Sequence, residues 1–231
     1  KCHHVALIAK PAIEKNYAYS PVHRLHKWVG TKWESLEEKP KEALSVPLHQ
    51  WMDQMNWQRR SSSQFNSIKD ELLTRIRPEI WNHPHLMSFN NGTYNIKTDQ
   101  FIPVHNKKDY LTHSFNFDFN RSAKCPQFEK FLDESFEGDK ELIELLRAAF
   151  KWSLLPKDRK KAYEIELFFD LFGRKGSGKG TLLEVLMAVV GGENSCGTIR
   201  PNTLDKTTSR YSLVGKKIAI DPDSSGHIKN V

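Results

Sequence analysis

The stretch LFFDLFGRKGSGKGTLLEVLMAVVG, from Leu167 to Gly191, decides the predicted fold of this chain. An apolar run comes first, a loop rich in glycines and cations follows, and a second apolar run with helical spacing ends at a glycine pair. Glycines let the backbone N–H groups of such a loop converge on one point, and cations there attract an anion. The order therefore predicts a strand, an anion-binding turn and a helix.

The two flanking elements have clear sequence limits. Residues from Tyr163 to Phe172 are rich in Phe, Leu and Ile without clean alternation, which is typical of a central parallel strand buried on both faces. Residues from Thr181 to Val190 have helical spacing, and the pair Gly191 and Gly192 that follows is a C-cap signal. The N-terminus of that helix, with its partial positive charge, would point at the loop.

The loop from Gly173 to Lys179 has the GxxxxGK spacing of a Walker A motif, in which backbone N–H groups surround phosphate oxygens. Lys179 would neutralise the β- and γ-phosphate charge. Gly180 stands where Ser or Thr usually binds Mg²⁺, and Thr181 supplies a hydroxyl one residue later. The predicted nucleotide contacts are Gly173, Gly176, Ser177, Gly178, Lys179, Gly180 and Thr181. The alternative is a glycine-rich turn with chance basic residues.

A Walker A loop needs an acidic partner that holds Mg²⁺ and polarises the attacking water. Asp221 and Asp223 follow the β-prone run Ile218–Ile220, as expected for a Walker B strand. We predict Thr181, Asp221 and Asp223 as metal ligands, and Lys179, Asp221 and Asp223 as catalytic residues. The alternative is an ordinary acidic turn after a strand.

The composition limits the class of protein. The chain has 231 residues, 38% hydrophobic and 27% charged, which indicates a globular protein and not a disordered one. Lys and Arg outnumber Asp and Glu by 35 to 28, and this excess favours a polyanionic partner. Three widely spaced cysteines do not suggest a disulfide framework. No apolar stretch approaches the roughly 20 residues of a membrane span, so we predict a soluble protein of the cytoplasm.

Residue composition and spacing divide the rest of the chain into two further regions. Residues 1–85 form a predicted helical N-terminal region, in which Phe65, Ile68, Leu72 and Ile76 keep a helical rhythm after a cap at Ser61 to Ser63. Residues 86–160 begin with an Asn-Gly turn between β-prone runs, which predicts a hairpin. Two short helices follow, separated at Gly138. Residues 161–231 would form a partial P-loop core.

In addition to the loop, three segments of the chain resemble a known family. They are SFNNGTYNIKTDQFIPVHNKKDYLTHSFNFDFN (88–120), CPQFEKFLDESFEGDKELIELLRAAFKWSLL (125–155) and TLDKTTSRYSLVGKKIAIDPD (203–223). Together with the Walker A loop, they make the chain from Leu86 to Val231 resemble the carboxy-terminal part of phage and plasmid primase-helicases. These proteins are related to the poxvirus primase-helicase and belong to helicase superfamily 3.

The resemblance implies an α/β fold with a P-loop NTPase core of the AAA+ type, preceded by a mostly helical α+β domain. It implies an ATP- and Mg²⁺-dependent DNA helicase that moves on single-stranded DNA as a homo-oligomeric ring, usually a hexamer. Asp223 takes the place of the family's Walker B glutamate. The family's sensor Asn, arginine finger and DNA-gripping hairpin lie beyond Val231, so we expect a fragment of a longer viral or plasmid protein with an upstream primase or primase-polymerase domain. Such a fragment alone would hydrolyse ATP poorly.

Two other functions stay open. GSGKGT is also the loop of nucleoside monophosphate kinases, although these need an Arg-rich lid and only Arg200 and Arg210 follow the loop here. A nucleotide-dependent ring scaffold without unwinding activity is the second alternative. AMP phosphorylation and DNA-stimulated ATP hydrolysis separate the three.

Two weaker patterns lie near the N-terminus. VHRLHKWVGTKW, residues 22–33, mixes cations with Trp28 and Trp33 and could hold phosphates and stack bases, but inward-facing tryptophans with solvated cations are the simpler reading. The sequence also offers a set of possible zinc ligands whose spacing fits no standard zinc finger. This set is Cys2, His3, His4, His23 and His26.

Overall fold

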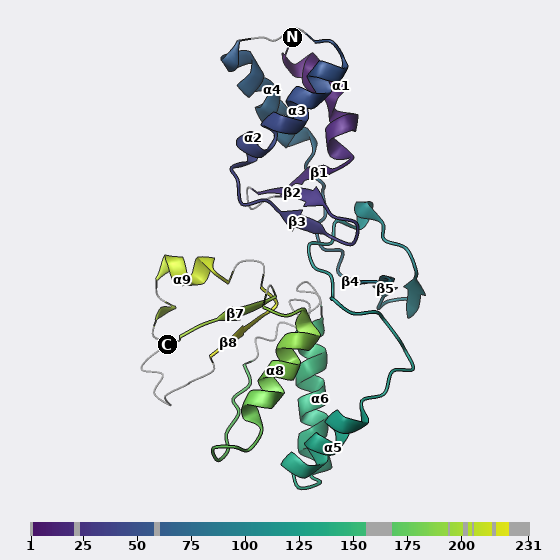
Figure 1. Cartoon of the computed structure of the whole chain (residues 1–231), viewed down its shortest axis with the longest axis vertical. Helices are drawn as coiled ribbons and strands as arrows, with labels where there is room; N and C mark the ends of the chain where they lie inside the picture. Colours follow the sequence, from purple (N-terminus) through teal and green to yellow (C-terminus); the bar gives the residue numbers. More distant parts are fainter. Residues whose placement is uncertain are drawn as a thin grey trace. The chain divides into compact units, whose positions relative to one another are not determined.

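The computed structural model describes residues 2–20, 24–57, 61–155, 168–193, 195–200, 203–204, 206–213 and 216–221 (Figure 1). The chain forms two compact units, the first made of residues 1–88 with 92–114 and the second of residues 89–91 with 115–231. The main division therefore falls near residue 115. The three regions that the sequence suggested, 1–85, 86–160 and 161–231, stay a prediction.

Helices build the core of the first unit. They are α1 (Cys2–Glu14), α2 (Pro40–Ala43), α3 (Ser45–Gln54) and α4 (Ser62–Arg75). Helix α1 packs along α4 and also contacts α3, so that Val5, Ile68 and Leu72 are buried together. The predicted cap of α4 is confirmed, because Ser61 Oγ accepts a hydrogen bond from the Gln64 N–H at 3.4 Å.

A small sheet was missing from the helical prediction for residues 1–85. Strands β1 (Tyr17–Tyr19), β2 (Leu25–Trp28) and β3 (Trp33–Ser35) form an antiparallel meander. The signal was present in the β-prone Tyr and Trp residues and in Gly30, which adopts a positive φ of 96° between β2 and β3. The short strands were hard to see because each spans only three or four residues.

The predicted hairpin is confirmed as part of a second meander, β4 (Leu86–Phe89), β5 (Gly92–Asn95) and β6 (Gln100–Ile102). Strands β5 and β6 pair antiparallel, with Thr93 opposite Ile102. Gly92 has φ 152°, and a Cβ there would overlap the backbone oxygen of Ile102 and lie 2.8 Å from Pro103 Cα. A short 3₁₀ helix, η1 (Lys107–Asp109), follows the sheet.

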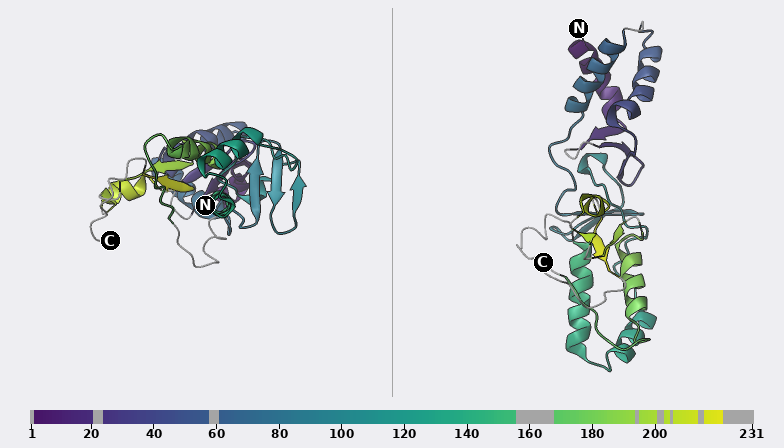
Figure 2. Two further views of the ribbon diagram at one scale, coloured as in Figure 1. Left: turned by 90° about the horizontal axis from the view of Figure 1, so that it is seen from below. Right: turned by 90° about the vertical axis from the view of Figure 1, so that its left-hand side faces the viewer.

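The second unit is built around helices α5 (Pro126–Ser135), α6 (Lys140–Leu154) and α8 (Lys179–Val190). Helices α6 and α8 lie side by side, as Figures 1 and 2 show. The predicted break at Gly138 is confirmed, and Asp139 caps α6 by accepting hydrogen bonds from the N–H groups of Glu141 and Leu142. Strands β7 (Cys196–Thr198) and β8 (Ile218–Ile220) pair in parallel, and helix α9 (Thr207–Tyr211) lies between them in sequence.

The predicted strand from Tyr163 to Phe172 is not seen where the structure describes it. Residues 163–167 lie outside the described residues, and residues 168–172 have no regular structure. Phe168 is 84% exposed and Phe172 is 88% exposed, the opposite of a strand buried on both faces. Apolar composition favours a central strand only when neighbouring strands satisfy its backbone, and no described strand pairs with residues 168–172.

Within the described ranges, no helix is long and apolar enough to cross a membrane.

Candidate phosphate-binding site

The glycine-rich loop leads directly into helix α8, as the sequence predicted. Gly178 is the N-cap residue and adopts φ 84° and ψ 2°, and Gly176 has φ 82°. Side chains rarely tolerate this left-handed region, so both positions require glycine. The Leu182 N–H donates to Gly178 O at 2.9 Å and starts the helical ladder. The predicted C-cap is confirmed at Gly191, with φ 112°.

Lys179 turns its ammonium group back into the loop. Nζ donates to Gly173 O at 2.8 Å, to Arg174 O at 2.8 Å and to Ser177 Oγ at 3.3 Å. An ammonium group has three N–H donors, so the loop itself uses all of them. The predicted phosphate contact therefore lies in the predicted loop, where it cross-links the segment from Gly173 to Ser177.

The start of α8 is suited to an anion. The N–H groups of the first helical turn have no acceptor within the helix, and Gly178 has no side chain that could cap them. The macrodipole of this 12-residue helix adds roughly half a positive charge at the same end. Gly180 and Thr181 lie in this first turn and are exposed. The loop residues from Gly173 to Ser177 are exposed as well, so a ligand can reach them.

The acidic partner is described only in part. Asp221 follows β8 directly, at the carboxyl end of a parallel strand, as predicted, and it is partly buried. Asp223 lies outside the described residues. In the part of the chain that the structure describes, no group of three or more His, Cys, Asp or Glu side chains is close enough to hold a metal ion.

Two neighbours of the loop, Phe131 and Ser135, were not predicted from the sequence. A Cβ at Gly178 would lie 2.8 Å from Cζ and 2.9 Å from Cε2 of Phe131, and 3.4 Å from Oγ of Ser135. Both residues belong to α5, far from the loop in sequence. No local sequence signal connects Phe131 or Ser135 to the loop.

Within residues 24–33, Trp33 is buried and Lys27 is exposed, while Arg24, Trp28 and Lys32 are partly buried. Trp33 is 1% exposed, and its Nε1–H donates to Lys107 O at 2.8 Å. The Trp33 ring also stacks on Tyr110, with centroids 5.5 Å apart. Trp28 lies partly exposed against Trp33, and Lys27 points to solvent. Trp33 is therefore a core residue and is not available to stack on a nucleobase.

The suggested zinc ligands lie in different settings. His3 pairs with Glu71 at 3.0 Å and contacts Arg75, while His26 is buried and its ring lies 4.7 Å from that of Trp81. Burial lowers the pKa of His26 below its usual value. His23 lies outside the described residues.

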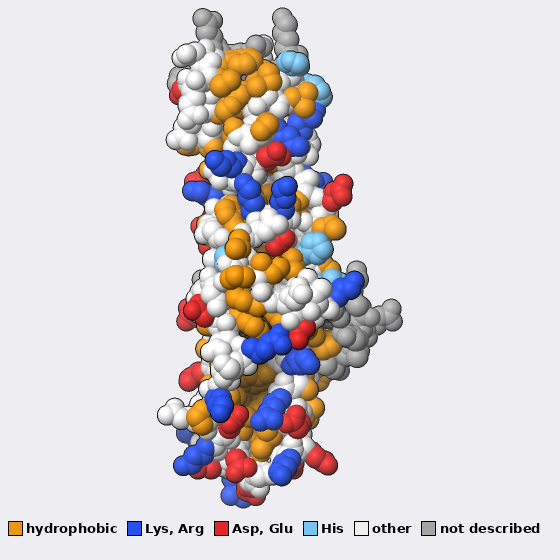
Figure 3. All heavy atoms as spheres, turned by 90° about the vertical axis from the view of Figure 1, so that its right-hand side faces the viewer, with side chains coloured by type: hydrophobic (Ala, Val, Ile, Leu, Met, Phe, Trp, Pro, Cys, Tyr) orange, Lys and Arg blue, Asp and Glu red, His pale blue; other side chains and the backbone are white. Residues whose placement is uncertain are grey.

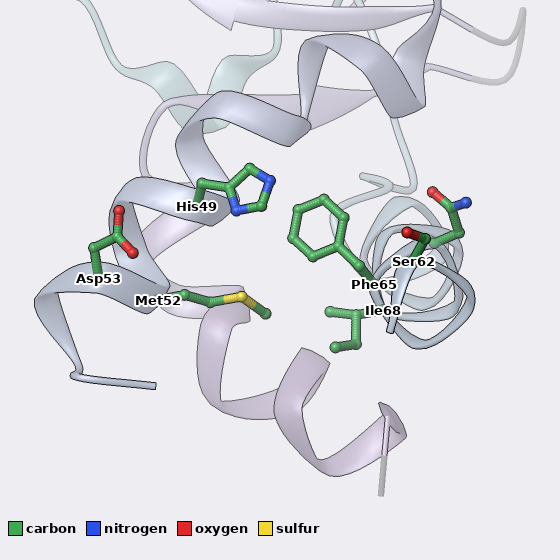
Figure 4. Close-up of a pocket in the computed structure, with 7 residues that line it drawn as sticks. His49, Met52, Asp53, Ser62, Phe65 and Ile68 are labelled. Atoms are coloured by element: carbon green, nitrogen blue, oxygen red, sulfur yellow. The ribbon is translucent and has the colours of Figure 1, made fainter. Parts of the chain in front are cut away.

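Figure 4 shows a pocket of about 350 Å³ between α3 and α4 that the sequence did not suggest. The rings of His49 and Phe65 stack 4.2 Å apart in it. Beside them Lys69, only 7% exposed, places its Nζ 4.9 Å over the Phe65 ring, and burial lowers the pKa of this ammonium group. The lining residues are His49, Met52, Asp53, Ser62, Phe65, Asn66 and Ile68. One stacked imidazole and one carboxylate among them form no evident catalytic pair, and we assign the pocket no reaction.

The excess of positive charge is dispersed on the face that Figure 3 draws. Lys and Arg side chains alternate there with Asp and Glu side chains. Elsewhere in the described chain, cations also form ion pairs, among them Lys41 with Asp70 at 2.7 Å and Lys130 with Glu134 at 3.6 Å. Net charge alone therefore does not locate a nucleic-acid surface.

A comparison with protein families gives one match. The family model described as D5 N terminal like matches residues 8–137, more than half of the chain. This model represents the N-terminal region of D5-like primase-helicase proteins. From the sequence we placed the resemblance to primase-helicases only in the chain from Leu86 onward. That limit was wrong, since most of the matched region lies before Leu86. The match does not reach the glycine-rich loop.

Proposed function

This chain belongs to the D5 N-terminal-like family, which is found in primase-helicase replication proteins of phages and viruses, and we propose that it is part of an ATP-dependent DNA helicase. Members of this class are enzymes of DNA replication. In the proposed reaction, ATP hydrolysis drives translocation on single-stranded DNA. A homo-oligomeric ring, the hexamer usual in superfamily 3, and an upstream primase or primase-polymerase domain belong to the same proposal.

The loop before α8 is the observation that supports ATP binding. Two glycines in the left-handed region, an uncapped helical N-terminus and a lysine ammonium group meet within seven residues, Gly173 to Lys179. The ammonium group of Lys179 already makes charge-assisted hydrogen bonds to the carbonyl oxygens of Gly173 and Arg174. Phosphate oxygens also carry negative charge, so exchanging the carbonyl oxygens for them adds the Coulomb attraction of opposite charges.

The donor set also fits Mg²⁺ bound together with a nucleotide. Such an ion keeps several waters and takes only one or two protein ligands besides the phosphates. Thr181, in the first turn of α8, and Asp221, after β8, supply a hydroxyl and a carboxylate, and Asp223 is the remaining proposed ligand. Bound there, Mg²⁺ would neutralise phosphate charge.

Lys179→Ala tests the nucleotide site, and Lys175→Ala is the matched control because it removes the same charge from an exposed position in the same loop. Losing two charge-assisted hydrogen bonds, each about 1.5 kcal/mol, corresponds to roughly a 100-fold loss of ATP affinity. Removing the exposed Lys175 should change affinity less than about threefold. Titration calorimetry with an ATP analogue and Mg²⁺ measures both, and equal affinities of the two variants would refute the assignment.

Steady-state assays then separate the functions. ATP hydrolysis stimulated by single-stranded DNA supports the helicase. Phosphorylation of AMP would instead identify a nucleoside monophosphate kinase, and ATP binding with neither activity would identify a ring scaffold. Because hydrolysis by a ring ATPase can depend on residues outside this chain, the assays should be run on the full-length protein.

A further inference from the structure

Helix α5 contacts the glycine-rich loop at Gly178 but not at Gly176. Gly178 and Gly176 have nearly the same φ, 84° and 82°. A Cβ at Gly176 would meet no described atom within 4 Å, whereas one at Gly178 would collide with the Phe131 ring at 2.8 Å. The edge of that ring therefore lies directly against the Gly178 backbone, at the residue where the loop becomes helix α8.

The place of the Phe131 ring is set by helix packing and not by the loop. Phe131 stacks on Phe128, with centroids 6.0 Å apart and planes at 20°. Phe128 in turn contacts Phe150 of α6 at 6.0 Å, and Leu132 beside it is buried. A row of aromatic rings thus joins α6 to α5 and ends at the loop.

The backbone of Gly178 controls the groups that would face a phosphate. Its φ and ψ set the direction of the first N–H groups of α8, and Lys179 is the next residue. A misplacement of about 1 Å of the groups in a catalytic site can reduce the reaction rate by roughly 100-fold. Glycine itself has little conformational preference, so an outside contact is needed to hold one geometry.

We infer that α5 shapes the phosphate-binding loop, and that Phe131 is a positioning residue whose ring holds Gly178 in the geometry that presents the α8 N–H groups to an anion. This inference rests on the proposed function of the loop. Helix α5 lies within residues 8–137, so the D5 N-terminal-like region itself supports the nucleotide site. Ser135 makes a second, smaller contact at the same corner.

The test uses Phe131→Ala and Phe131→Leu in the whole chain, with Phe136→Ala as the control. Phe136 follows α5 and is partly buried, but it is not among the nearest neighbours of Gly178. Titration with an ATP analogue and Mg²⁺ should show about tenfold weaker binding for Phe131→Ala, recovery of most affinity in Phe131→Leu, and little change for Phe136→Ala. Equal losses of affinity in Phe131→Ala and Phe136→Ala would overturn the inference.

Amide hydrogen exchange without nucleotide makes the test independent of ATP binding. Exchange in a peptide covering residues 176–182 should rise about tenfold in Phe131→Ala and stay unchanged in Phe136→Ala. If Phe131→Ala does not fold, Phe131→Leu should show a smaller rise in the same peptide. If the unaltered chain binds no ATP but amide exchange rises in Phe131→Ala as expected, the function proposed for the loop is wrong and the positioning role of Phe131 is still supported. Unchanged exchange in both Phe131 variants refutes the positioning role.

Discussion

The substitution Trp33→Phe tests whether Trp33, in the segment of residues 24–33, packs in the protein core or stacks on the bases of a nucleic acid. In the structure the Trp33 ring is enclosed, its Nε1–H bonds to Lys107 O at 2.8 Å, and its backbone N–H bonds to Leu111 O at 2.7 Å. Trp33 thereby links strand β3 to η1 and to the segment after it. Phenylalanine keeps an aromatic ring but cannot donate the side-chain hydrogen bond.

The expected cost of Trp33→Phe is roughly 2–3 kcal/mol. Loss of the hydrogen bond to Lys107 O contributes about 1 kcal/mol, and the rest comes from the smaller ring, which leaves a gap and weakens the stacking on Tyr110. For a chain of this length, that corresponds to a fall in melting temperature of roughly 5–10 °C. Trp28→Phe is the matched control, because Trp28 is partly exposed and should cost less than about 1 kcal/mol.

Far-UV circular dichroism measures the thermal unfolding of both variants, and fluorescence anisotropy with a labelled oligonucleotide measures binding of single-stranded DNA. We expect Trp33→Phe to lower stability and to leave any DNA affinity within about twofold at a temperature where it is folded. An unchanged melting temperature together with clearly weaker DNA binding would show that Trp33 stacks on bases, and the assignment to the core would be wrong.

Two further predictions concern the first unit. Burial lowers the pKa of His26, so its neutral form supports folding above the unfolded-state pKa of about 6.5, and this support is lost as the pH falls through the lower folded pKa. Urea unfolding at pH 7.5 and 5.5 should show lower stability at pH 5.5, and a smaller difference in His26→Gln; an equal pH dependence in both proteins would contradict the assignment. Gly92→Ala should cost about 3–5 kcal/mol, because backbone atoms of Ile102 and Pro103 block a Cβ, whereas Gly30→Ala, with no described atom within 4 Å, should cost only the backbone strain of about 1–2 kcal/mol. Similar melting temperatures for these two variants would refute the steric argument.

Part of the molecule follows from local sequence signals. The cap at Ser61, the break at Gly138, helix α8 with its C-cap at Gly191, and strand β8 were all predicted, and the structure contains each of them. These features depend on backbone preferences and hydrogen bonds within a few residues, and such preferences can be read from spacing alone. The spacing of glycines and Lys179 likewise placed the loop at the start of a helix.

The sequence by itself therefore determined where the glycine-rich loop, helix α8 and strand β8 lie along the chain. Only the tertiary structure decided that Phe131 abuts Gly178, that Trp33 is enclosed, that Lys179 bonds to its own loop, and that Phe168 is exposed despite its apolar neighbours. Each of these depends on which surfaces meet after the chain has folded. Periodicity reports that a side chain is apolar, but the packing of distant segments decides what it contacts.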